Sequence, residues 1–275
     1  DIPGADLEGV FVLRNLTDAL QLKAYLNEKN CRKAVLIGGG YIGMEMCEAM
    51  RNLGIQTTVI DLLPRPVVRW DEEFAKTVLD ELGKHEVQFQ GETRPLAIET
   101  GKECRLVLKT DKGDLDADVI LMGVGTRREV SLAKAAGLEM GDSGAIKVDF
   151  RQQTSREGIY AVGDCCEVFH KVAGCWVYFP LGDIANKQGR VAGQNIGGRP
   201  AEFPGIVGAQ SFKVFDLEVG ATGLTEEEAT QYGFQPLSIM IQGLPVGRPM
   251  ARGEKLGVKL VADRTTGKLL GGQCV

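Results

Sequence analysis

Histidine is scarce in this sequence, and its cysteines do not follow the spacing of a metal site or a disulfide framework. There are two histidines, and the seven cysteines are an odd number with no Cys-x-x-Cys pair. Zinc sites need clustered cysteine and histidine, and disulfide frameworks need regularly spaced pairs. We therefore expect no metal ion and no disulfide scaffold. Cys165 and Cys166 are adjacent, but neighbouring cysteines close a strained ring, so we interpret them as small buried side chains rather than a redox pair.

Long apolar runs and concentrated charge of one sign are also missing. No apolar stretch approaches the roughly 20 residues that cross a bilayer, and no signal peptide precedes Asp1, so the expected compartment is the cytoplasm without a membrane partner. The net charge is only −5 and the lysines and arginines form no basic stripe, so nucleic acid is not an expected partner. The length of 275 residues suits about two globular domains.

The sequence is rich in glycine, and the most informative glycines form the run Gly-Gly-Gly-Tyr-Ile-Gly at 38–43. The run follows an apolar stretch, Lys33 to Ile37, and opens a segment with helical periodicity. In such a strand-turn-helix unit, Gly38 permits the reversal, Gly40 admits a pyrophosphate and Gly43 allows the helix to pack closely. The helix N-terminus then offers free N–H groups to the phosphates. The alternative is a glycine turn that serves packing alone.

An acidic residue lies where a dinucleotide site needs one. The next predicted strand, Gln56 to Ile60, ends directly in Asp61. A carboxylate about 20 residues after the glycines accepts hydrogen bonds from ribose hydroxyls and repels a 2′-phosphate, which favours NAD over NADP. Arg65 and Arg69 follow and either meet a 2′-phosphate or are solvated loop arginines, which leaves NADP open. Replacing Asp61 with alanine is predicted to weaken NADH binding more than NADPH binding.

The flanking segments predict an α/β unit with a parallel sheet and an inserted β-meander. Helices are expected at about 17–30 and from the cap Asp71 to about Leu82, ended by Gly83. The expected strands are 87–90, 95–99, 104–110, 114–116 and 119–122. Gly125 follows the last of these, either facing the nicotinamide or forming only a turn. Residues 1–12 show no clear element and are interpreted as part of a larger unit.

A second informative stretch runs from Thr154 to Asp164. A buried strand is expected at 159–162, followed by Gly163 and Asp164. At a strand end, the glycine would let a ligand approach the backbone, and the carboxylate would accept a hydrogen bond from a sugar or ribitol hydroxyl. The alternative is an ordinary Gly-Asp turn.

The remainder, from Phe203, predicts a smaller α+β unit with a half-buried sheet. Thr225 and Glu228 form the capping-box pattern of a helix over 225–232. The expected strands are 211–218, 237–242, 256–262 and 268–275.

Several of these motifs together resemble the FAD-dependent pyridine nucleotide-disulfide oxidoreductases, with the coenzyme A-disulfide reductase and NADH oxidase branch as the nearest. The motifs are 38–43 with Glu45, then 154–164, 180–190, 213–216 and 222–227. The resemblance implies a Rossmann-like NAD-binding domain with a β-meander crossover, part of an FAD-binding domain and an α+β dimerisation domain. The implied division is 1–30 as connector and part of the FAD domain, 31–147 as the NAD(P)-binding domain, 148–200 as the C-terminal part of the FAD-binding domain and 201–275 as a partial dimerisation domain.

The resemblance also implies roles for single residues. Gly163 and Asp164 would hold the flavin ribitol, while Leu181 and Gly182 would lie beside the pyrimidine edge of the flavin ring. A helix starting near Asp183 would direct its positive end at the same edge. The implied cofactor-binding set is Gly38, Gly40, Tyr41, Ile42, Gly43, Glu45, Asp61, Gly125, Gly163, Asp164, Leu181 and Gly182.

Two of these residues would also contact the nicotinamide. Tyr41 is similar to an aromatic gate that moves aside for the ring, and Glu45 to a carboxylate near its carboxamide. The alternatives are core packing for the tyrosine and a solvated helix face for the glutamate. The loop at 125–129 reads Gly-Thr-Arg-Arg-Glu, which departs from the family's Gly-x-x-Pro-Asn.

The expected function follows from the resemblance. NADH would pass hydride to FAD, and the electrons would continue to a disulfide, persulfide or dioxygen through a cysteine outside this chain, in a homodimer. The sequence is interpreted as a fragment that lacks the first FAD-binding half, so no catalytic residue is assigned within it. The alternative is a catalytically incomplete NAD-binding and interface module.

Overall fold

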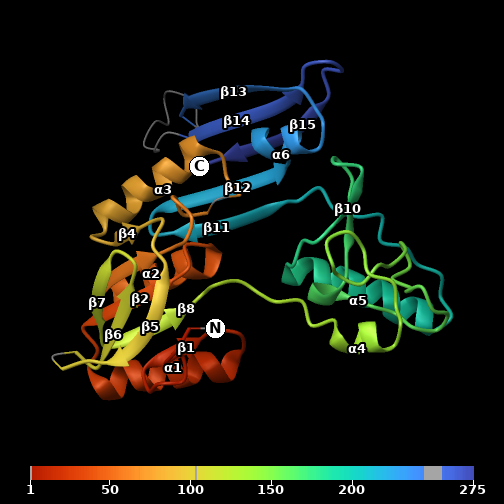
Figure 1. Cartoon of the computed structure of the whole chain (residues 1–275). Coiled ribbons are helices and arrows are strands. Elements are labelled where there is room, and N and C mark those ends of the chain that lie inside the picture. Colours follow the sequence, from red (N-terminus) through yellow and green to blue (C-terminus); the bar gives the residue numbers. More distant parts are fainter. Residues whose placement is uncertain (1, 68, 103, 245–255) are drawn as a thin grey trace.

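The computed structural model describes residues 2–67, 69–102, 104–244 and 256–275 (Figure 1). Asp1, where the predicted connector begins, lies outside these residues. We refer to residues 2–122 as the parallel-sheet unit, 123–209 as the middle segment and 210–275 as the C-terminal unit. In Figure 1 the middle segment lies to one side of the other two units, reached by an extended stretch after β8. Among the described residues, no helix is both long enough and apolar enough to span a bilayer.

The parallel-sheet unit is built on five parallel strands in the order β1-β8-β2-β3-β4. The strands are β1 (Val10–Val12), β2 (Lys33–Ile37), β3 (Gln56–Ile60), β4 (Gln88–Gln90) and β8 (Val119–Met122). The helices are α1 (Leu16–Lys29), α2 (Tyr41–Asn52) and α3 (Glu72–Lys84). Along β2 the side chains alternate between two cores, since Leu36 packs on the helix side and Val35 on the opposite side. Both faces of the sheet are therefore covered, as parallel sheets require.

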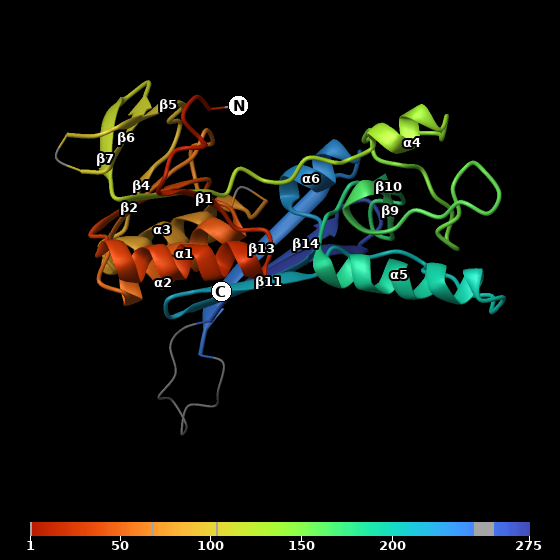
Figure 2. The same ribbon diagram turned by 90° about the horizontal axis from the view of Figure 1, so that it is seen from below.

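The opposite face is covered by the predicted β-meander. Its antiparallel strands are β5 (Pro95–Thr100), β6 (Leu106–Thr110) and β7 (Gly113–Ala117). Figure 2 shows this small sheet and the helices on opposite sides of the parallel strands. The prediction of an α/β unit with a β-meander crossover is confirmed.

Helix ends in this unit differ from the sequence prediction at two places. α1 begins one residue earlier than expected, because Asn15 caps it and shares a capping box with Asp18. α3 does not end at Gly83 but continues to Lys84, with His85 as its C-cap. Gly83 is therefore a helical residue. Strand β1 was not predicted at all, because residues 1–12 show no strand pattern in the sequence.

The middle segment has little regular structure apart from one long helix. Its elements are α4 (Ser131–Ala135), the 3₁₀ turn η1 (Gly163–Cys165), β9 (Val168–His170), β10 (Cys175–Val177) and α5 (Gly182–Ile196). The buried strand expected at 159–162 is wrong. Ile159 and Val162 are 39% and 36% exposed, and this stretch bonds back to its own turn, since Ala161 N–H donates to the Gln152 carbonyl. Among the described residues it makes only an isolated antiparallel bridge, between Tyr160 and Gln153, and no ladder with a neighbouring strand.

The C-terminal unit is an antiparallel sheet in the order β11-β12-β15-β14-β13, with one short helix. The elements are β11 (Gln210–Val214), β12 (Leu217–Gly223), α6 (Glu226–Gln231), β13 (Pro236–Gly243), β14 (Leu256–Asp263) and β15 (Leu269–Cys274). The expected single strand at 211–218 is wrong, because the chain reverses at Phe215, whose φ is 50°. The capping box of Thr225 and Glu228 is present, with each backbone N–H donating to the other side chain.

The C-terminal unit packs directly on the parallel-sheet unit. One continuous core joins Met44 and Phe74 of the helices to Phe212 and Val219 of the sheet. At its edge the carboxylate of Glu48 accepts from the Phe215 N–H at 2.7 Å. These contacts hold α2 and α3 against the sheet.

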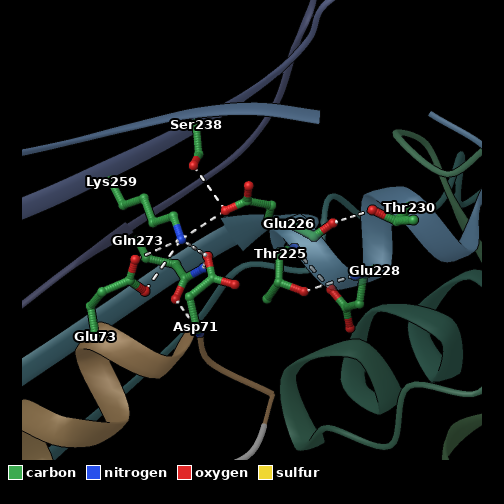
Figure 3. Close-up of polar contacts among 9 residues, drawn as sticks. All are labelled: Asp71, Glu73, Thr225, Glu226, Glu228, Thr230, Ser238, Lys259 and Gln273. Atoms are coloured by element: carbon green, nitrogen blue, oxygen red, sulfur yellow. Dashed lines mark hydrogen bonds and ion pairs between the residues drawn. The ribbon is translucent and has the colours of Figure 1, made fainter. Parts of the chain in front are cut away.

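A buried lysine adds a polar link across the same interface (Figure 3). The Lys259 ammonium lies 3.1 Å from Asp71, 3.2 Å from Glu73 and 3.1 Å from Glu226, and its side chain is only 4% exposed. Burial opposes its charge, but the hydrogen bonds that the ammonium donates to these carboxylates outweigh the burial and raise the pKa of Lys259. Gln273 completes the link, since its amide donates to the Asp71 carboxylate at 2.7 Å.

Candidate functional site

The glycine turn has the close packing that its spacing predicts. Gly38 has a φ of 115°, and a Cβ added there would lie 2.3 Å from the Gly123 carbonyl oxygen. A Cβ on Gly43 would lie 2.0 Å from the Gly38 carbonyl oxygen. Both positions therefore exclude any larger residue, because α2 rests directly on the ends of β2 and β8.

Gly40 differs from its neighbours because it faces open space. It is the N-cap of α2, no side chain caps the helix there, and no atom lies within 4 Å of an added Cβ. The first N–H groups of the helix, at Tyr41 and Ile42, have no intrahelical partner by position. Together with the positive end of the helix dipole, this fits a pyrophosphate.

Asp61 lies beside this turn, at the end of β3. Its carboxylate accepts from the Gly39 N–H at 2.6 Å and from the Leu63 N–H at 2.9 Å. These two bonds fix the carboxylate on the side of the turn away from β8. Each carboxylate oxygen retains a further lone pair, so the group fits the ribose hydroxyls of a bound dinucleotide.

A cavity of about 850 Å³ lies where the three parts of the chain meet. Tyr41 and Glu45 enter it from α2, and Leu181 and Gly182 from the start of α5. The C-terminal unit supplies the remaining wall, with Gln210, Phe212, Thr222, Leu260, Gln273 and Cys274 among its residues. The structure thus brings four of the predicted site residues to one cavity. Gly125, Gly163 and Asp164 do not line it, and Gly125 lies in the exposed stretch after β8.

Tyr41 is held at the wall of this cavity by residues that the sequence did not indicate. Its hydroxyl donates to Gln210 Oε1 at 2.5 Å and accepts from Trp70 Nε1 at 3.3 Å. Its ring lies 5.2 Å from the ring of Phe212. Burial raises the pKa of Tyr41, so the phenol is neutral near pH 7. Core packing, the alternative given for Tyr41 in the sequence analysis, is therefore an incomplete description, because the hydroxyl also makes two hydrogen bonds.

The start of α5 forms a second uncapped helix end. Leu181 is the N-cap and provides no side-chain hydrogen bond. Gly163, with a φ of 76°, lies against this helix and its N–H donates to Gln188 at 2.8 Å. Asp164 is exposed beside it. A positive helix end next to an exposed carboxylate and a glycine fits the polar edge and the hydroxyls of a flavin.

The adjacent cysteines lie beside α5, where the Cys166 thiol donates to Gln188 Oε1 at 3.7 Å. Both are free thiols; Cys166 is buried as expected, whereas Cys165 is only half-buried. The hydrogen bond between them lowers the pKa of Cys165 and raises that of Cys166. The side chain of Cys166 packs in a small core with Ile146 and Ala161.

Two family models match nearly the whole chain. The model described as "Pyridine nucleotide-disulphide oxidoreductase" matches residues 1–189. The model described as "Pyridine nucleotide-disulphide oxidoreductase, dimerisation domain" matches residues 209–275.

Similar proteins include sulfur-reducing and oxygen-reducing enzymes. The NAD(P)H sulfur oxidoreductase (CoA-dependent) of Pyrococcus furiosus is 36% identical over 276 residues, which cover 100% of this chain and 62% of that protein. A NAD-dependent persulfide reductase from A. fulgidus has a TM-score of 0.93 at 34% identity, covering 99% of this chain and 51% of that one. The water-forming NADH oxidase from Lactobacillus brevis, solved with NADH, has a TM-score of 0.93 at 28% identity, covering 100% of this chain and 60% of that one. The chain thus spans about three fifths of the curated relative's length.

Proposed function

Because the chain belongs to the pyridine nucleotide-disulphide oxidoreductase family, we propose that it takes part in hydride transfer from NADH to FAD. The observation that carries this proposal is the cavity shared by the glycine-turn helix and the start of α5. One wall fits the nicotinamide end of a dinucleotide and the other fits a flavin edge, so the two groups would meet there. The electrons would continue to a disulfide, persulfide or dioxygen through a cysteine outside this chain.

The parallel-sheet unit would bind and orient the nucleotide. The N–H groups at the start of α2 would hold the pyrophosphate over Gly40, and Asp61 would hold the ribose of the adenosine half. That arrangement directs the other half of the dinucleotide towards Tyr41 and Glu45. Glu45 is exposed and, like Tyr41, lines the cavity from α2. It would accept a hydrogen bond from the carboxamide of the nicotinamide.

The middle segment would orient the flavin. FAD supplies the hydride-accepting chemistry, and the protein supplies position and electrostatics. Leu181 and Gly182 would contact one edge of the ring, where the positive end of α5 favours negative charge. Gly163 and Asp164 would hold the ribitol hydroxyls, with Gln188 fixing the Gly163 backbone by its 2.8 Å hydrogen bond.

The C-terminal unit would form a homodimer interface. Along β13, Leu237, Ile239 and Ile241 are 50%, 63% and 61% exposed and alternate with other residues, so they share one apolar face of the sheet. A second copy of the chain would cover this face. A catalytically incomplete NAD-binding and interface module is the second candidate, because the glycine turn and the exposed face of β13 would by themselves serve binding and association.

One preparation separates the two candidates. The purified protein, passed through a sizing column with light scattering and detection at flavin wavelengths, is expected to elute at twice its chain mass with flavin absorbance that NADH bleaches without oxygen. A colourless protein that binds NADH would favour the binding module. Flavin that NADH does not bleach would contradict the proposed transfer.

Asp61 is expected to set the choice between the two nucleotides. In an Asp61→Asn variant the side-chain oxygen still accepts from Gly39, the acceptor for the Leu63 N–H is lost, and the charge that repels a 2′-phosphate is gone. NADH binding should weaken by about 10- to 100-fold, because a hydrogen bond to a charged group is worth roughly 1.5–3 kcal/mol, and NADPH binding should strengthen. Calorimetric titration of both nucleotides measures the ratio. An unchanged preference would remove Asp61 from the selection of nucleotide.

A further inference from the structure

The hydroxyl of Tyr41 is held by two residues that lie far from it in the sequence. Gln210 is 169 positions away and accepts its proton at 2.5 Å, while Trp70 is 29 positions away and donates to its oxygen at 3.3 Å. One partner is on β11 of the C-terminal unit and the other precedes α3. The position of the tyrosine at the cavity wall is therefore set from outside its own helix.

Both partners are themselves fixed. Trp70 is 1% exposed and its ring packs 5.7 Å from Phe212 and 6.5 Å from Phe74. The next residue, Asp71, donates its backbone N–H to Gln273 at 3.0 Å. Gln210 is the first residue of β11, which pairs along its length with β12. A side chain held between two such anchors loses little further entropy when its hydrogen bonds form.

The position of Tyr41 matters for only one half of a dinucleotide. It follows Gly40 directly, so a pyrophosphate at the helix end separates the tyrosine from Asp61 on the other side of the turn. Tyr41, Gln210 and Phe212 line the same cavity as Leu181. A dinucleotide that places its nicotinamide in this cavity meets the tyrosine ring, whereas the same ligand without its nicotinamide does not.

We propose that Gln210 and Trp70 are positioning residues that hold Tyr41 in place across the nicotinamide end of the site. The proposal rests on the proposed function, because it takes the cavity as the nicotinamide site. Entry of the nicotinamide displaces the tyrosine ring and breaks its hydrogen bonds to both residues. The cost of breaking them lowers the affinity for the whole dinucleotide and leaves the affinity for its adenosine half unchanged.

The test compares NAD⁺ with ADP-ribose, which lacks the nicotinamide. In a Gln210→Leu variant of similar side-chain volume, the tyrosine loses its acceptor and its held position is destabilised. The dissociation constant for NAD⁺ should fall about fivefold to tenfold, as expected for one hydrogen bond, while that for ADP-ribose stays the same. Gln194→Leu, on an exposed position of α5, is the matched control and should change neither. Isothermal titration of each variant with each ligand gives four dissociation constants, each of which is compared with the wild-type value.

A second measurement follows Trp70 fluorescence in a variant that keeps both hydrogen bonds of Tyr41. The chain has two tryptophans, so a Trp176→Phe variant keeps Trp70 as the single fluorophore. NAD⁺ should shift the emission of Trp70, because the indole loses its hydrogen bond to Tyr41, and ADP-ribose should not. Equal shifts with both ligands, or equal changes of both affinities in Gln210→Leu, would overturn the proposal. Failure of wild-type protein to bind ADP-ribose would instead overturn the proposed dinucleotide site.

Discussion

Replacing Lys259 with methionine is expected to lower the free energy of unfolding by about 3–5 kcal/mol, the usual cost of removing one partner of a buried ion pair. Methionine has a similar length and fills the space, so the loss comes from charge. The ammonium lies within 3.2 Å of Asp71, Glu73 and Glu226, and Asp71 is only 9% exposed. Its carboxylate would remain buried with the Gln273 amide as its main partner.

The matched control is the same substitution at an exposed pair in the same interface. Lys213 lies 3.2 Å from Glu48, but its side chain is 57% exposed. Exposed pairs contribute about 0–1 kcal/mol, so Lys213→Met should change stability by less than that. Urea unfolding of both variants measures the difference. Similar losses of unfolding free energy in the two variants would show that the ion pairs of Lys259 stabilise the fold no more than a surface pair does.

Replacing Gly40 with alanine is expected to remove most dinucleotide binding while leaving the fold intact. The φ of Gly40 is −77°, which alanine adopts freely, and no atom lies within 4 Å of the new Cβ. The helix-capping preference for glycine over alanine is offset by the lower entropy of the unfolded chain, so stability should change by less than about 1 kcal/mol. The methyl group would instead occupy the space proposed for the pyrophosphate. Loss of one charge-assisted N–H bond would weaken NADH and ADP-ribose alike by about 10- to 100-fold.

Gly83 provides the control for this variant. It lies in α3 of the same unit and is also open, with no atom within 4 Å of an added Cβ. Gly83→Ala should stabilise the helix by roughly 0.5–1 kcal/mol and leave nucleotide binding unchanged. Calorimetric titration together with thermal unfolding separates the two effects. A Gly40→Ala protein that binds both ligands normally would contradict the pyrophosphate site.

The sequence predicts most reliably those features whose signals lie close together along the chain. The strand, turn and helix around the 38–43 glycines depend on spacing within about 30 residues, a length typical of one such unit. The capping box of α6 depends on Thr225 and Glu228, three residues apart. In both cases the local pattern and the tertiary structure favour the same conformation.

The failures have identifiable physical causes. The turn between β11 and β12 was missed because Asp216 is its only turn-favouring residue, and Phe215 adopts a positive φ that its residue type rarely shows. The strand expected at 159–162 had a suitable apolar composition but has no neighbouring strand among the described residues. A strand needs a partner, and composition alone does not provide one.

The contacts that define the cavity could not be predicted by any local rule. Tyr41 and Gln210 are 169 residues apart, and neither residue type indicates the other. Lys259 likewise belongs to an alternating strand pattern whose other members face either core or solvent. Only the packing of the C-terminal unit on α2 and α3 determines which polar side chains meet.

The order of the parallel sheet has a consequence for how the chain is made. Among the described residues β1 pairs only with β8, so residues 10–12 emerge from the ribosome about 110 positions before their partner at 120–122. The Asp71–Gln273 contact spans 202 residues and closes only when synthesis of this stretch is complete. Because distant contacts form slowly, the nascent parallel-sheet unit should expose the surface around Trp70 for much of translation. That surface is buried only when the C-terminal sheet packs on it.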